Sequence, residues 1–177
     1  LHQSAHKQKD NNENHPMPPK PQGSEEGIIK GAYKLRSAPK GEGPIVRLLG
    51  SGPIMLQLLA AVEILETYGV RSEIYSVTSY GELRRDGLEC ERENRLNPGN
   101  AGRASYVEQL LGDGKYPTIA VSDNQIAVPD MIRQWVGGDY SVLGTDGFGR
   151  SDTRPNLRRF FEICLLYTSP SPRDPRE

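Results

Sequence analysis

The sequence predicts an α/β fold, with an open, mostly parallel β-sheet flanked by helices and preceded by an extended N-terminal linker. Two observations support this prediction. Segments that suit strands lie at residues 45–49, 70–77, 118–121 and 140–143, and the first of them is apolar enough for a buried strand. Segments with apolar residues at helical spacing separate these predicted strands, and strands that alternate with helices favour a parallel sheet.

The N-terminal region is predicted to be a linker. Residues 1–24 are polar and contain four prolines, which remove backbone donors and favour extended chain. Ser24 is expected to begin a short helix that runs through Leu35. Its apolar contacts would be Ile28, Ile29 and Tyr33. A second break at 39–44 completes a segment, residues 1–44, that we assign to a linker and the end of a preceding domain.

The first predicted strand leads through a sharp turn into a helix. Gly50-Ser51-Gly52-Pro53 follows the run at 45–49, and apolar residues then recur at helical spacing from Ile54 to Leu65. Gly69 stands where a left-handed residue would end that helix. The second strand, at 70–77, comes directly afterwards.

The remaining elements follow in the same alternation. The charged stretch 81–96 is expected to contain a short helix, and Asn97-Pro98-Gly99-Asn100 forms a turn. Another helix is predicted around 106–111, and a further one from Pro129 to Val136, with proline in its first turn. A last helix is expected to run through Phe161.

The α/β domain is therefore expected to span residues 45–162. Residues 163–177 break the amphipathic pattern abruptly, and their composition resembles translated adapter sequence. We assign them to a non-native tail, with a natural proline-rich tail as the alternative. Because residue 1 is leucine, we also expect that the start of the protein is missing.

Composition excludes several classes of function. The formal net charge of −1 does not favour nucleic acid as a partner, and no apolar stretch is long enough to span a membrane. All three histidines lie within the first fifteen residues, so the body of the chain has no Ser-His-Asp or Cys-His centre. Two cysteines are too few for a disulfide scaffold and fit a reducing, cytoplasmic compartment. Cys90 is expected to be a packing residue, and no metal site is predicted.

The glycine-rich turn after the first strand is a weak candidate for phosphate binding. Backbone N–H groups at a helix N-terminus attract anions. A dinucleotide fingerprint, however, requires a third glycine where this sequence has Met55, and Pro53 removes one donor. A structural turn is the preferred interpretation.

The segment from Gly144 to Arg154 is the principal candidate site. It contains three glycines within six residues after a strand, which predict a mobile or sharply bent loop. Ligands of open α/β sheets bind at strand ends. Arg150 and Arg154 lie near the start of the following helix, where cations are mildly unfavourable. These arginines are expected to meet an anion or a partner carboxylate, or else to pair internally with Asp146 or Asp152. The candidate residues are Gly149, Arg150, Ser151, Asp152 and Arg154.

Several blocks together resemble the homodimeric type of pyruvate dehydrogenase first component, over about residues 12 to 162. Their order and spacing make the match specific, although Glu93 and His15 depart from the family pattern. The blocks are Ser24-Glu25-Glu26-Gly27-Ile28-Ile29-Lys30-Gly31, Leu48-Leu49-Gly50-Ser51-Gly52, Tyr75-Ser76-Val77-Thr78-Ser79, Glu82-Leu83-Arg84-Arg85-Asp86-Gly87, Cys90-Glu91-Arg92, Leu143-Gly144-Thr145-Asp146-Gly147-Phe148-Gly149-Arg150-Ser151-Asp152 and Asn156-Leu157-Arg158.

The resemblance implies the C-terminal domain of a transketolase-like enzyme. In that family the whole enzyme decarboxylates pyruvate on thiamine diphosphate and reductively acetylates a lipoyl group on the acyltransferase component. The cofactor and its magnesium are held by two upstream domains, across a homodimer interface. This domain would serve packing and dimer assembly, and would lend the loop at 149–154 to the entrance of the active site. The chain alone would then be inactive.

Two other functions are left open by the residues themselves. One is a free-standing interaction module without catalysis. The mixed-charge stretch from Glu82 to Arg95 does not decide this, because it fits a solvated helix with i,i+4 pairs, or else an interdomain or dimer contact. The other is a Rossmann-type nucleotide-binding domain, which the missing third glycine disfavours.

Overall fold

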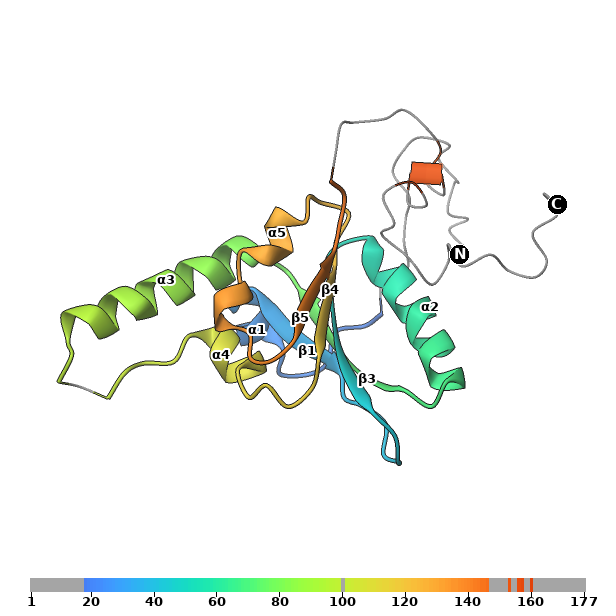
Figure 1. Cartoon of the computed structure of the whole chain (residues 1–177), viewed down its shortest axis with the longest axis horizontal. Coiled ribbons are helices and arrows are strands. Elements are labelled where there is room, and N and C mark those ends of the chain that lie inside the picture. Colours follow the sequence, from blue (N-terminus) through green and yellow to red (C-terminus); the bar gives the residue numbers. More distant parts are fainter. Residues whose placement is uncertain (1–17, 100, 147–152, 154–155, 158–159, 161–177) are drawn as a thin grey trace, which may run out of the picture.

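The computed structural model describes residues 18–99, 101–146, 153, 156–157 and 160. At its centre lies a five-stranded sheet with the strand order β1-β3-β2-β4-β5 (Figure 1). The strands are β1 (Ala32–Arg36), β2 (Ile45–Gly50), β3 (Arg71–Val77), β4 (Thr118–Val121) and β5 (Tyr140–Leu143). β1 runs antiparallel to β3, and every other neighbouring pair is parallel. The predicted open, mostly parallel sheet is thus confirmed.

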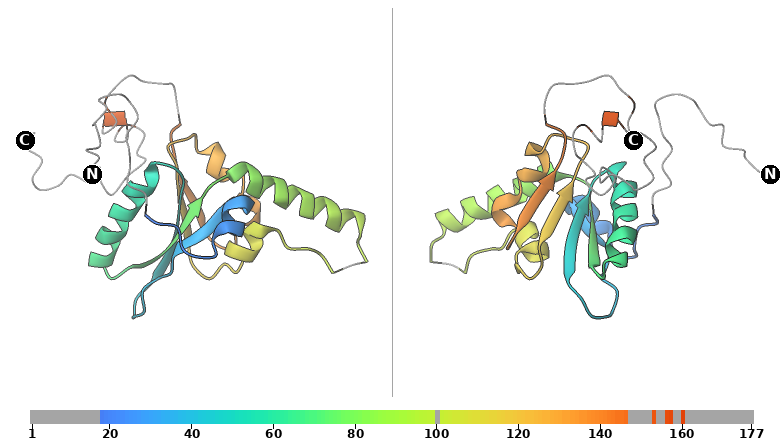
Figure 2. Two further views of the ribbon diagram at one scale, coloured as in Figure 1. Left: turned by 180° about the vertical axis from the view of Figure 1, so that it is seen from behind. Right: turned by 45° about the vertical axis from the view of Figure 1, so that its right-hand side comes forward.

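Helices cover both faces of this sheet. They are α1 (Glu25–Lys30), α2 (Ile54–Thr67), α3 (Tyr80–Leu96), α4 (Tyr106–Leu111) and α5 (Ala127–Asp130), with a 3-10 turn η1 (Arg133–Trp135). Figure 2 shows α2 on one face and α3 and α4 on the other. This arrangement follows from the connections, because each parallel pair needs a crossover that passes over one face.

Two apolar cores result, one on each face. Successive residues of a strand point to opposite faces, so Leu48 and Leu49 belong to different cores. The core under α2 contains Val46, Leu48, Ile54, Met55, Leu58, Val62, Ile74 and Val121. The core under α3 and α4 contains Leu49, Tyr75, Val77, Leu83, Val107, Ala120, Ile132 and Trp135, among others. Burial on both faces explains why the central strands β2 and β4 consist mostly of apolar residues.

The helix predicted from Ser24 through Leu35 is wrong beyond Lys30. Gly31 ends α1 in a left-handed conformation (φ 106°), and its carbonyl accepts hydrogen bonds from the Thr78 and Ser79 amides at 2.9 and 3.1 Å. A Cβ at Gly31 would lie 2.5 Å from the Ser79 carbonyl oxygen, so glycine is needed there. Ala32–Arg36 then pairs with β3. The sheet therefore includes residues that the sequence analysis placed before the domain.

α3 is longer than the short helix predicted within 81–96. It has 17 residues, and Ser79 caps its N-terminus: the Ser79 hydroxyl accepts a hydrogen bond from the Glu82 amide at 3.1 Å. Its second half extends beyond the sheet before the chain returns to α4 (Figure 1). The mixed charges along it make the expected helix-surface pairs, Arg85 with Glu82 and Arg95 with Glu91.

The single helix predicted from Pro129 to Val136 is replaced by α5 and η1. In a continuous helix the Pro129 carbonyl would accept from the amide of residue 133. It instead accepts from the Tyr140 hydroxyl at 2.8 Å, while the Arg133 guanidinium donates to the Tyr140 carbonyl at 2.7 Å. The contact with β5 therefore interrupts the helix. Ile132 and Trp135 are buried in the core.

Candidate functional site

The carboxyl edge of the sheet is where the fold places its candidate site. β2, β3, β4 and β5 all end there, at Gly50, Val77, Val121 and Leu143. The order of the strands also reverses at β2, because the chain continues from β2 to β3 on one side and later to β4 on the other side. Ligands of open α/β sheets bind outside the carboxyl ends of the strands at such a switch point.

Side chains of α2 occupy the space next to Gly50, at the end of β2. A Cβ at Gly50 would lie 3.0 Å from Leu58 Cδ1 and 3.1 Å from Met55 Cε, so this glycine accommodates the first turns of α2. Gly52 adopts a left-handed conformation (φ 58°) in the turn before the helix. The sharp turn predicted here is confirmed. Met55 is buried where a dinucleotide fingerprint would have its third glycine, which disfavours the nucleotide-binding alternative.

The loops after β4 and β5 are joined to each other. The Thr145 amide donates to the Asn124 carbonyl at 2.9 Å, and its hydroxyl donates to the Asp123 carbonyl at 3.0 Å. The Asp146 carboxylate accepts from the Ile126 amide at 3.2 Å. These bonds come from residues 20 or more apart in sequence. They fix the position at which the chain leaves β5 towards the predicted loop.

Gly144 makes this junction possible. A Cβ there would lie 2.8 Å from the Asn124 carbonyl oxygen and 3.1 Å from the Ile126 amide nitrogen. Any side chain would therefore separate the two loops. The glycine was predicted to permit a bend, and the structure gives the reason as a close approach between loops.

The predicted site residues Gly149, Arg150, Ser151, Asp152 and Arg154 lie outside the described residues. Their pairing with Asp146 or Asp152 therefore stays a prediction. The described part of the last predicted helix is helical at Asn156, Leu157 and Phe160, and the Leu157 amide donates to the Thr153 carbonyl at 2.9 Å.

The described carboxyl edge holds no catalytic set of its own. The residues described contain no histidine, and no group of three or more His, Cys, Asp or Glu among them is placed to bind a metal. Ser122 is fully buried, and its hydroxyl accepts from the Asn124 amide at 3.0 Å. Cys90 is buried in α3, and its burial raises the pKa of the thiol. Cys90 is thus a packing residue, as predicted.

A buried ionic cluster lies at the opposite, amino-terminal half of the sheet, and sequence reasoning missed it. Arg47 on β2 is only 4% exposed. Its guanidinium donates to both carboxylate oxygens of Asp113, at 2.5 and 2.8 Å, and to Glu73 at 3.2 Å. Lys34 and the Tyr75 hydroxyl also contact Glu73, each at 3.2 Å. The signal in the sequence was Arg47 itself, because a charged residue inside an otherwise apolar strand requires a buried partner.

The charges of this cluster stabilise one another. The hydrogen bonds that Arg47 donates to Asp113 lower the pKa of Asp113 to about 2 and raise the pKa of Arg47. Burial alone would raise the pKa of Glu73, but Lys34 and Arg47 outweigh it and the pKa is lowered. Each carboxylate is thereby kept ionised. The cluster joins β2, β3 and the loop before β4, which is a structural role.

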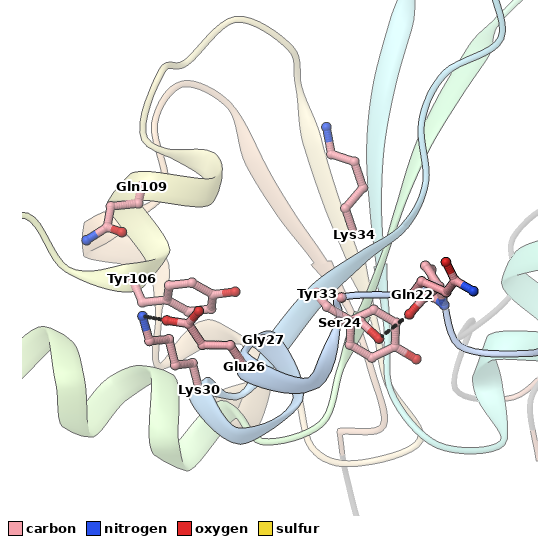
Figure 3. A pocket seen from close by; sticks show the side chains of 11 residues that line it. Gln22, Ser24, Glu26, Gly27, Lys30, Tyr33, Lys34, Tyr106 and Gln109 are labelled. Atoms are coloured by element: carbon pink, nitrogen blue, oxygen red, sulfur yellow. Dashed lines mark hydrogen bonds and ion pairs between the residues drawn. The ribbon is translucent and has the colours of Figure 1, made fainter.

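A hollow of about 410 Å³ lies between α1, β1 and α4, beside the point where the described chain begins. Figure 3 shows Lys30 directed at Glu26 next to the Tyr106 ring. The Lys30 ammonium lies 2.7 Å from the Glu26 carboxylate and 5.0 Å from the centre of that ring. The Tyr106 hydroxyl donates to the Ala32 carbonyl at 2.9 Å. Each of these polar groups already has a partner within the protein, so we assign the hollow a structural role.

Among the described residues, none of the helices combines the length and the apolar composition that a bilayer crossing requires. This agrees with the absence of a long apolar stretch in the sequence.

Curated relatives share about half of their aligned residues with this chain. The pyruvate dehydrogenase E1 component of Pseudomonas aeruginosa is 49% identical over 154 residues, which are 86% of this chain and 18% of that protein. The protein of the same name from Escherichia coli K12 is 49% identical over 158 residues, 88% of this chain and 18% of its own length. The chain therefore spans less than one fifth of the length of these relatives.

The fold agrees with solved structures. A transketolase from Campylobacter jejuni superposes with a TM-score of 0.51 at 20% identity, covering 80% of this chain and 18% of that one. At this identity the likeness shows the fold alone. The family described as the transketolase-like TK C-terminal domain matches residues 31–164, which include β1 and the whole sheet. The chain therefore belongs to the transketolase-like TK C-terminal domain family.

Proposed function

We propose that this chain is the C-terminal domain of a thiamine-diphosphate-dependent pyruvate dehydrogenase first component. The observation that carries the proposal is the 49% identity to pyruvate dehydrogenase E1 components over 86% of the chain. The complete homodimeric enzyme would act in the cytoplasm, decarboxylate pyruvate and reductively acetylate lipoyl groups on an acyltransferase component. The interaction-module and nucleotide-binding alternatives have no comparable support.

The domain would contribute to this reaction without holding the cofactor. Among the described residues there is no carboxylate cluster for magnesium. The sequence has one Gly-Asp-Gly run, Gly112-Asp113-Gly114, but no Asn-Asn pair follows it, and the Asp113 carboxylate binds Arg47. The residues present do not fit thiamine diphosphate, which would be bound by upstream domains. The chain by itself is expected to be inactive.

The contribution we propose comes from the carboxyl edge of the sheet. Gly144, Thr145 and Asp146 are held against the loop after β4 by the hydrogen bonds described above. The chain leaves this fixed junction towards Gly149, Arg150, Ser151, Asp152 and Arg154. We infer that these residues border the entrance to the active site, where the arginines would meet an anionic group of the substrate or a partner carboxylate.

The test uses the full-length enzyme with Arg150→Ala and Asp152→Ala. Loss of one charged contact in the transition state should lower kcat/KM for pyruvate by about tenfold, which corresponds to about 1.4 kcal/mol. Arg36→Ala is the matched control, because Arg36 is half-exposed near the amino-terminal half of the sheet and pairs only with Glu66 in the described structure. Wild-type kinetics for both loop variants would refute the assignment of this loop.

A further inference from the structure

A second hollow, of about 500 Å³, lies on the outer side of the fold between α3 and the α5–η1 segment. In Figures 1 and 2, α5 lies beside the first half of α3. The hollow is lined by Arg84, Leu88, Asp130, Met131, Arg133 and Gln134. It is separate from the loops after β2, β4 and β5 that form the candidate site.

The lining of this hollow includes two apolar residues, Leu88 and Met131. Leu88 is 41% exposed although it follows Gly87, which packs against the Trp135 ring. Met131 is partly buried and packs on the core beneath α3. These two side chains give the lining an apolar part that a partner's apolar side chain could cover.

The rim of the hollow carries one uncompensated positive charge. Asp130 and Arg133 pair with each other at 2.6 Å, and Arg133 also donates to the Tyr140 carbonyl at 2.7 Å. Arg84 is exposed and has no ion-pair partner in the part of the chain that the structure describes. The neighbouring Arg85 does have one, in Glu82. The lining therefore has a net charge of +1 at Arg84.

The surface around the hollow is held rigidly in place. One turn along α3, Glu91 accepts from the side chains of Gln134 and Trp135, both at 3.0 Å, and it pairs with Arg95 at 3.6 Å. These contacts tie α3 to η1 across the hollow. A preformed surface loses little conformational entropy when it binds a partner.

We propose that this hollow binds an acidic peptide segment of a partner protein, with an apolar side chain on Leu88 and Met131 and a carboxylate on Arg84. A basic segment would fit poorly, because the only carboxylate in the lining already pairs with Arg133. A second copy of this chain offers a weaker match. Glu25 and Glu26 of its helix α1 already pair with Lys20 and Lys30. Exposed carboxylates elsewhere, such as Glu63, make binding of a second copy an outcome that the test distinguishes.

The test measures fluorescence anisotropy of a labelled 15-residue amphipathic peptide with glutamate and leucine at i,i+4 spacing, added to this chain. The matched peptide has glutamine in place of each glutamate. We expect the acidic peptide to bind at least tenfold more tightly than the glutamine peptide, and to bind more weakly as salt is raised. This binding assay does not depend on the proposed enzymatic function, so the two can fail separately.

Three variants locate the binding. Arg84→Glu should weaken binding of the acidic peptide by about tenfold, because attraction is replaced by repulsion. Leu88→Ala should weaken its binding severalfold. Arg85→Glu, on the same helix but outside the lining, should change the affinity by less than about twofold. Thermal melting of each variant shows that the fold is kept, since all three positions are exposed.

Two results would overturn the proposal. One is equal binding of the two peptides, or an Arg84→Glu affinity equal to that of the parent chain. The other is a dimer of the chain in size-exclusion chromatography that Arg84→Glu dissociates, which would assign the hollow to a second copy.

Discussion

Replacing Asp113 with asparagine removes the carboxylate that the buried Arg47 guanidinium binds at two points, 2.5 and 2.8 Å away. Asparagine keeps one oxygen acceptor of the same size. The change therefore removes a charge and one acceptor with little change in packing. Arg47 would remain buried with Glu73, 3.2 Å away, as its carboxylate partner.

The structure sets the size of the expected effect. The pKa of Asp113 is lowered from its ordinary value of 3.8 to about 2, mainly by the hydrogen bonds from Arg47. Taken at face value this shift corresponds to about 2.4 kcal/mol of stabilisation. The Asp113 side chain is 54% exposed, however, and water screens the pair, so we expect about 1 kcal/mol.

The pH dependence gives the sign of the effect. The pKa of Asp113 is lower in the folded chain than in the unfolded chain, so its stabilisation is present above pH 4 and is lost as the pH falls towards 2. The Asp113→Asn variant should therefore unfold with a free energy about 1 kcal/mol below that of the parent chain at pH 7. That difference should shrink between pH 4 and pH 2.

Urea unfolding followed by circular dichroism at pH 7, 5 and 3 measures this difference. Asp139→Asn is the control, because the Asp139 side chain makes no ion pair or hydrogen bond within the described residues, and it should change stability by less than about 0.5 kcal/mol. A difference between Asp113→Asn and the parent that stays constant from pH 7 to pH 3 would refute the electrostatic explanation, as would no difference at all.

Two further changes test the packing. Gly87→Ala places a Cβ 2.5 Å from the Trp135 ring, so overpacking of about 1–3 kcal/mol should outweigh the roughly 1 kcal/mol gained in helix propensity. A lower melting temperature with altered tryptophan fluorescence is expected, and a higher one would contradict the contact. Ser105→Ala removes the hydroxyl that accepts from the Glu108 amide in a capping box, and it should cost about 1 kcal/mol in urea unfolding. An unchanged midpoint would show that the cap contributes nothing.

The parallel strands were predictable because their residues are buried on both faces. β2, β3, β4 and β5 lie within a residue of the predicted strands, because each carries apolar residues that pack in the cores on the two faces of the sheet. α2 and α4 were predictable for a related reason, because one apolar side of each faces the sheet at helical spacing. Local chemistry was sufficient at these elements.

The edge strand β1 was not predictable in the same way. Ile28, Ile29 and Tyr33 have helical spacing, yet Ile29 is 77% exposed and Tyr33 lies in a strand. The helix ends where Gly31 meets the first residues after β3, nearly fifty positions away in sequence. A boundary that depends on a contact at such a separation leaves little local signal.

The candidate site was also predictable only in part from the sequence. Glycines after β5 predicted a bend, but only the fold brings Gly144 against the loop after β4 and so explains why a glycine is needed. The hollow beside α3 is a stronger case. Arg84 and Leu88 are ordinary surface residues of a charged helix until α5 and η1 place Met131 and Arg133 opposite them.

The sequence by itself therefore determined the class of fold, the identity of the parallel strands and the family resemblance, because these depend on residue type and on spacing along the chain. The tertiary structure alone decided the strand order, the antiparallel β1, the pairing of the buried Arg47 with Asp113, and the hollow beside α3. The physical reason is the range of the interactions. The apolar patterns of strands and helices can be recognised within a few consecutive residues. A buried ion pair or a concave surface exists only where segments distant in the sequence meet.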